Sequence, residues 1–145
     1  MNTFSSEICK ALEENNIRPA VGTTLVEIAD FFTRIESYDR YINVDFDDFL
    51  SLIRESSVIG IASETVSYDN IGSALRSILA TTVDGSKPSS VIVNFNIGPD
   101  FMMEHMHLVS EAVETLPSDV NMTWGMSHSN SDAREVEVAV AMGYK

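Results

Sequence analysis

The sequence is poor in basic residues, in cysteine and in glycine, and each shortage excludes a class of protein. Lys and Arg total 9 against 22 Asp and Glu, and the net charge of −13 repels phosphate backbones and anionic lipids. We therefore expect neither nucleic acid nor a membrane as a direct partner. Cys9 is the only cysteine, which excludes an internal disulfide and favours a reducing compartment. The 7 glycines form neither a P-loop nor a dinucleotide fingerprint.

Long apolar runs are also missing. No run approaches the roughly 20 residues that span a bilayer, and the start MNTFSSEICK lacks the basic and apolar parts of a signal peptide. We therefore expect a soluble, cytoplasmic protein. The hydrophobic content of 44% is nevertheless ample for the core of one ordinary domain of 145 residues.

The spacing of apolar residues predicts helices that alternate with strands. Helical spacing covers residues 24–36 and the segments that follow Asp45, Asp69 and Asp100, whereas VIGIAS at 58–63 and VIVNFNI at 91–97 are typical of strands. Two more strands close the chain, and we expect the turn SNSD at 129–132 to join them as a hairpin. The order predicts an α/β fold, an α+β sandwich built on a mixed four-stranded sheet with helices.

The helix at 24–36 is apolar on more than one side. Ile28 and Phe32 belong to one stripe, while Val26 and Phe31 fall outside it. Such a helix needs cover, either from a short N-terminal helix around Ile8 or from a second chain. We favour pairing between chains. The expected oligomer face consists of Leu25, Val26, Ile28, Phe31 and Phe32.

A methionine-rich segment follows Pro99 and Asp100, where we expect a helix with Met102 and Met106 facing inward. Adaptable core packing is the simpler interpretation of these methionines, and a groove for promiscuous partners is the alternative. The nearby EHMH invites a metal site, but its two histidines are two residues apart and point to different faces of a helix. We therefore expect no metal.

Three aspartates lie within four positions of INVDFDD. Asp45 occupies an expected N-cap, and Asp47 and Asp48 fall in the first helical turn. Carboxylates there accept free backbone N–H groups and favour the helix dipole, each contributing about 0.3–1 kcal/mol. The cluster is thus explained by folding alone, unless other residues indicate more.

Four segments in order resemble the C-terminal, activation domain of FtsZ, the bacterial tubulin relative. They are IADFFTR, INVDFDD, VIVNFNIGPDFMMEH, and MTWGMSH with REVEVAVAMGY. The resemblance makes residues 24–145 an FtsZ C-terminal-like domain, preceded by the end of the central helix, and leaves 1–23 as an N-terminal helix and connector. A GGGTGTG-type signature is missing, so we expect no GTP binding or hydrolysis by this chain alone. IESYDRY replaces the short Pro-Gly turn of the family.

The resemblance also implies a role for the aspartate loop. In FtsZ filaments this loop enters the nucleotide site of the neighbouring subunit, where its acids orient the attacking water. Asn43, Asp45 and Asp48 match the family pattern, and Asp47 does not. We therefore expect a non-enzymatic, cofactor-free regulator of cell-division filaments that docks its Asn43–Asp48 loop on an FtsZ-like partner. The alternative is a self-associating scaffold without filament chemistry, so the expected partner is an FtsZ-like protein or the chain itself.

Overall fold

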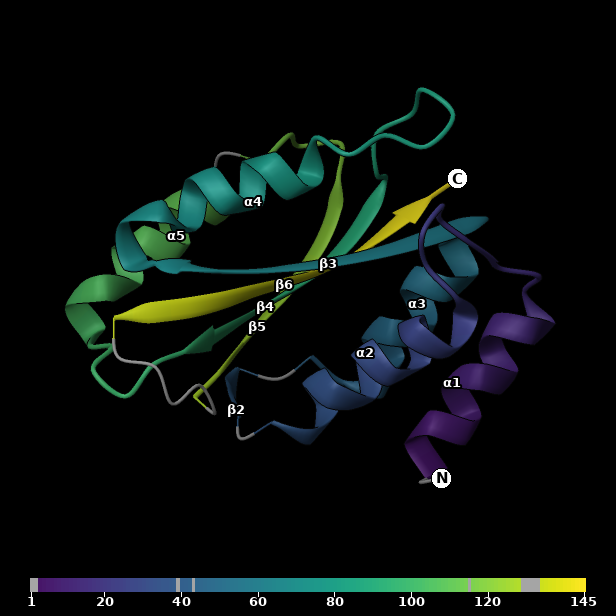
Figure 1. Cartoon of the computed structure of the whole chain (residues 1–145), viewed down its shortest axis with the longest axis horizontal. Coiled ribbons are helices and arrows are strands. Elements are labelled where there is room, and N and C mark those ends of the chain that lie inside the picture. Colours follow the sequence, from purple (N-terminus) through teal and green to yellow (C-terminus); the bar gives the residue numbers. More distant parts are fainter. Residues whose placement is uncertain (1–2, 39, 43, 115, 129–133) are drawn as a thin grey trace.

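The computed structural model describes residues 3–38, 40–42, 44–114, 116–128 and 134–145, which form three layers (Figure 1). The helices are α1 (Thr3–Glu14), α2 (Leu25–Ser37), α3 (Phe46–Glu55), α4 (Ile71–Leu79) and α5 (Met106–Glu114). The strands are β1 (Arg18–Pro19), β2 (Arg40–Ile42), β3 (Val58–Ser67), β4 (Ser90–Ile97), β5 (Asn121–Ser127) and β6 (Glu135–Tyr144). The sheet forms the middle layer, with α1, α2 and α3 on one face and α4 and α5 on the other. None of the described helices has the length and apolar character needed to cross a bilayer.

The described strands form one mixed sheet of six, in the order β1-β3-β6-β4-β5-β2. The expected α/β class is confirmed, and the four expected strands are β3, β4, β5 and β6. The two additional strands, β1 and β2, lie at the edges and have only 2 and 3 residues. Strands this short carry no alternating pattern, so they are invisible to periodicity. Through β1, Arg18 and Pro19 of the N-terminal segment pair with β3 in the same sheet.

The expected hairpin between the last two strands is wrong. β6 runs antiparallel to both β3 and β4, while β5 pairs in parallel with β4, so β4 separates β5 from β6. The expected turn at 129–132 lies outside the described residues. β6 lies in the interior of the sheet because it is apolar on both faces. Val138 and Val140 lie on one face, and Ala139 and Ala141 lie on the other. Such a strand is fully buried only where helices cover the sheet on both sides.

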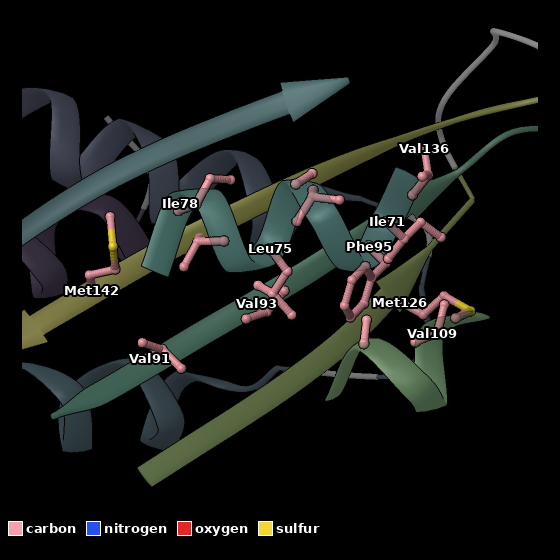
Figure 2. Close-up of a cluster of buried hydrophobic side chains, with 14 of the residues drawn as sticks. Ile71, Leu75, Ile78, Val91, Val93, Phe95, Val109, Met126, Val136 and Met142 are labelled. Carbon is pink, nitrogen blue, oxygen red and sulfur yellow. The ribbon is translucent and has the colours of Figure 1, made fainter. Parts of the chain in front are cut away.

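The α4 and α5 side of the sheet holds one core. Ile71, Leu75 and Ile78 of α4 point toward Val93 and Phe95 of β4 (Figure 2). These residues follow the i, i+3, i+4 spacing of a helix and the alternation of a strand, so the sequence pattern specifies this layer directly. Met102, expected to face inward here, is instead 60% exposed, because α5 begins only at Met106.

The opposite side of the sheet holds a second core under α1, α2 and α3. Ile28, Phe31 and Phe32 are buried there, covered in part by Ile8 and Leu12 of α1. Three residues of the expected oligomer face are therefore unavailable to a partner in this fold, while Leu25 is half-buried and Val26 is 65% exposed. Within one chain the N-terminal helix covers α2, which was the less favoured of the two expected covers, and pairing between chains stays a prediction.

Candidate functional site

The aspartate loop follows the end of α2, which is fixed to the sheet. The Arg34 Nη1 atom lies 3.0 Å from the Glu137 Oε2 atom of β6, and the Tyr38 hydroxyl donates to Glu137 Oε1 at 3.2 Å. Burial, and then the Glu137 charge, raise the pKa of Tyr38. After this anchor the chain forms β2, in which Ile42 pairs with Met126 of β5. The loop thus starts from a position set by two strands.

A glycine lets the chain cross closely over β5 just before the aspartates. A Cβ atom at Gly125 would lie 2.7 Å from the Val44 Cγ2 atom and 2.9 Å from the Ile42 carbonyl oxygen. Any side chain there would push this segment away from the sheet. Val44 itself is buried. Sequence reasoning missed Gly125, although a glycine inside a strand often marks such a close approach.

The expected N-cap at Asp45 is confirmed, and it forms a reciprocal capping box with Asp48. The Asp48 backbone N–H donates to Asp45 Oδ1 at 3.2 Å, and the Asp45 backbone N–H donates to Asp48 Oδ2 at 2.9 Å. Two backbone donors of the helix start thus receive side-chain acceptors, and the Asp48 N–H also lies 3.1 Å from the Asp45 carbonyl oxygen. Asn43, the third residue of the expected loop, lies outside the described residues.

The helix start concentrates negative charge. Asp45 and Asp47 are exposed, and Asp48 is half-buried. Burial raises the pKa of the Asp48 carboxyl above its ordinary value. The hydrogen bond from the Asp45 backbone lowers this pKa, and the charges of Asp45 and Asp47 raise it. In the part of the chain that the structure describes, no ion pair includes any of the three. The site therefore favours a cation or a hydrogen-bond donor brought from outside.

The aspartates do not line a substrate cleft of their own. A pocket that includes Asp48, together with Glu55 and Asn121, holds about 20 Å³, which is room for about one water molecule. A small-molecule substrate is far larger than this, since ligand pockets typically span about 300–1,000 Å³.

A buried polar cluster lies on the neighbouring strands, on the same face of the sheet. Asn94 Nδ2 donates to Ser127 Oγ at 3.0 Å, and Ser127 Oγ donates to Asn96 Oδ1 at 2.8 Å. Asn94 pairs in register with Gly125, so the cluster lies close to the point where the chain crosses β5. The Asn94 Oδ1 atom is buried and has no hydrogen-bond partner within the described residues. The two asparagines interrupt the apolar alternation of VIVNFNI, which is the signal that could have revealed them.

At the end of the sheet beyond β3 and β4, Asp100 connects two further segments. It accepts hydrogen bonds from the Tyr68 hydroxyl and, at 2.7 Å, from the Arg134 backbone N–H. The Tyr68 hydrogen bond, followed by that from Arg134, lowers the pKa of Asp100. Burial of Tyr68, together with the hydrogen bond and charge of Asp100, raises the pKa of Tyr68 to about 12.

The raised pKa of Tyr68 predicts that the protein loses stability in alkaline solution. Unfolded tyrosine ionises near pH 10, so the contribution of Tyr68 is fully present below pH 10 and disappears as the pH rises to about 12. The loss in free energy of unfolding should stay below about 3 kcal/mol, because solvent near the hydroxyl screens the charge of Asp100. Urea unfolding at pH 9 to 12 measures it, and Tyr68→Phe should flatten the decline. An equally steep decline in that variant would assign the effect to other groups.

Comparison with known proteins gives structural matches only. No family model matches the chain, and no curated protein sequence matches it. A mutant FtsZ from M. jannaschii matches with a TM-score of 0.59 and 17% identity, covering 82% of this chain and 37% of that one. TubZ of Bacillus thuringiensis serovar israelensis, solved as GDP-form protofilaments, matches with a TM-score of 0.53 and 9% identity, covering 82% and 34%.

These matches establish the fold. The chain has the fold of part of FtsZ and TubZ, and it spans little more than a third of the length of those proteins. The expected resemblance to one domain of an FtsZ-like protein is confirmed at this level. At such low identity the activity and partners of the whole proteins do not follow from the match.

Proposed function

We propose that the chain is a non-enzymatic FtsZ-like protein that docks its Asn43–Asp48 loop on the nucleotide-bearing face of an FtsZ-type subunit. Docking would cap or modulate filament assembly and would alter GTP hydrolysis in trans. The observation that carries the proposal is the exposed Asp45 carboxylate beside Asp48 at a fixed helix start, where the pocket lined by Asp48 holds only about 20 Å³. The similarity in fold to part of FtsZ supports it.

The chemistry requires carboxylates at this position. Water that attacks a γ-phosphate has to be oriented and relieved of a proton, and a neighbouring acid accelerates that step. The raised pKa of Asp48 makes its carboxylate a better proton acceptor than an ordinary aspartate. Asp45 has the exposure needed to reach a partner. The capping box restricts both side chains to one arrangement.

A variant that keeps the helix cap and removes the acids tests this proposal. Asn caps helices as well as Asp does, and Gln serves in a capping box, so Asp45→Asn with Asp48→Gln should preserve the start of α3. Substoichiometric wild-type chain should change the light scattering and GTP turnover of a polymerising FtsZ-type protein. The double variant should lose that effect while its melting temperature stays close to that of the wild type.

Asp47→Ala is the matched control, because it removes an equally exposed charge from the same turn without touching the capping box. It should retain the effect on turnover. A double variant that still alters turnover would refute a role for the acids. A wild-type chain without effect at equimolar ratio would refute docking on that partner.

Self-association is the second candidate function, as a structural scaffold. The similar structures include an FtsZ dimer from M. jannaschii and TubZ protofilaments. Sedimentation velocity over a range of concentrations distinguishes the candidates. A scaffold should assemble by itself and ignore the aspartate variants, whereas a filament regulator should act at concentrations where it remains a monomer.

A further inference from the structure

An apolar pocket lies at the carboxyl ends of the parallel strands β4 and β5, outside the aspartate loop. Its volume is about 640 Å³, within the range of pockets that bind ligands or side chains of partners. Ile97 of β4, Met126 of β5 and Ile42 of β2 form its inner wall. We call it the methionine pocket, because Met102, Met103, Met106 and Met126, four of the chain's 7 methionines, line it.

Two of these methionines are unusually exposed. Met102 is 60% exposed and Met103 is 86% exposed, and they are adjacent in the sequence. The apolar pattern predicts an inward position for Met102, but α5 starts later and the segment before it turns outward as a 3₁₀ turn at Met103–His105. Large apolar side chains gathered at the mouth of an apolar pocket mark a binding surface more often than a solvated one.

The rim of the pocket is held in place without a ligand. The Met102 backbone N–H donates to His105 Nδ1 at 2.9 Å, and the His105 backbone N–H donates to the Met102 carbonyl at 2.8 Å. The ring centroid of Phe101 lies 5.2 Å from that of Tyr68 and 5.4 Å from that of His105. A rim fixed in this way loses little entropy on binding, while the flexible methionine side chains still adapt to the occupant.

The negative charge near the pocket favours a positively charged ligand. Glu104 is the one charged side chain among the described lining residues, it is exposed, and the whole chain carries −13. An apolar surface with an acidic rim is complementary to a segment with apolar anchors and Lys or Arg beside them. We infer that the methionine pocket binds the apolar face of a basic amphipathic helix from a partner protein.

Other occupants fit less well. A second copy of this chain brings another −13, which opposes approach at an acidic rim. A small apolar molecule would find no placed donor or acceptor among the described lining residues apart from Glu104, although such groups normally fix a ligand's orientation. The inference goes beyond the proposed function, because it needs neither a filament nor the aspartate loop.

A labelled model peptide tests the inference directly. In this peptide leucines at i, i+3 and i+4 spacing form one helical face, and lysines occupy the other positions. Fluorescence anisotropy should show saturable binding by the wild-type chain. A scrambled peptide with the same lysine content but no apolar face should bind at least about tenfold more weakly. Equal binding of the two peptides would reduce the effect to charge and overturn the inference.

Variants of the chain locate the site. Met102→Gln with Met103→Gln removes apolar surface at the rim without adding charge, and it should weaken binding about tenfold. Val26→Gln is the matched control, since Val26 is a similarly exposed apolar side chain on the opposite layer. It should leave the affinity unchanged. Glu104→Gln should weaken binding about twofold to fivefold and reduce its dependence on salt.

Methionine methyl resonances give an independent readout. Peptide binding should shift the signals of Met102, Met103, Met106 and Met126 and leave those of Met122 and Met142 in place. Shifts confined to the latter two, or no binding of the amphipathic peptide at all, would overturn the inference. So would a small fluorescent lipophile that shifts the four pocket signals where the peptide does not, because the occupant would then be a small molecule.

Discussion

Replacing Phe32 with alanine should lower the free energy of unfolding by about 3–5 kcal/mol. Phe32 is fully buried, and its ring centroid lies 4.6 Å from that of Phe49 on α3. Phe4 of α1 packs against the same Phe49 and against Phe46, with its ring centroid 5.6 Å from each of theirs. The large cavity left by the missing ring cannot be closed by one helix alone. Urea unfolding followed by circular dichroism measures the loss.

Val26→Ala on the same helix is the control, because Val26 is 65% exposed and should change stability by less than about 0.5 kcal/mol. The same experiment separates two ways of covering α2. If α1 covers it within one chain, the unfolding midpoint should not depend on protein concentration. A midpoint that rises with concentration would show that a second chain contributes to this core, as the sequence alone had suggested.

Gly143→Ala should be nearly as damaging, with a loss of about 2–4 kcal/mol. A Cβ atom at this position of β6 would collide with the Ser56 Oγ atom and would lie 3.3 Å from Ser56 Cβ and 3.4 Å from Leu52 Cδ1. Overpacking of this kind costs about 1–3 kcal/mol. Moving Ser56 aside also breaks the 2.6 Å hydrogen bond from its hydroxyl to the Leu52 carbonyl, at about 1 kcal/mol.

A double-mutant cycle checks this explanation. Ser56→Ala alone should cost about 1 kcal/mol, because it removes the hydroxyl and its hydrogen bond together. Combined with Gly143→Ala, it should recover a large part of the loss, since the colliding oxygen is gone. Additive losses in the double variant would show that Ser56 is not the obstacle. Chemical unfolding of the four proteins side by side provides the comparison.

The helix starts show how far local sequence information reaches. Thr24 and Asp45 were expected at helix starts, and both cap their helices by accepting a hydrogen bond from a backbone N–H three residues on. A cap depends on groups within one turn, so the residue types at that spacing are sufficient evidence. The expected strands β4, β5 and β6 rest on equally local alternation, and β3 rests on the short apolar run VIGIAS. The site formed by Asn43, Asp45 and Asp48 was implied only by the resemblance to FtsZ, and its role stays a prediction.

The contacts around the aspartate loop could not be predicted from local sequence patterns. The approach of Val44 to Gly125 joins residues far apart in the chain, as do the contacts between Asn94, Ser127 and Asn96. No local pattern records which strands become neighbours. The methionine pocket is a similar case, because its inner wall comes from three strands and its rim depends on where α5 begins.

The sequence by itself determined the α/β class, the helix starts at Thr24 and Asp45, four of the strands and the acidic character of the chain. These properties follow from the spacing of residues a few positions apart and from composition. Only the tertiary structure decided that β6 enters between β3 and β4, that α1 covers α2, and that Met102 and Met103 face outward. Each of these depends on which distant surfaces bury one another, a choice made by the packing of the whole chain.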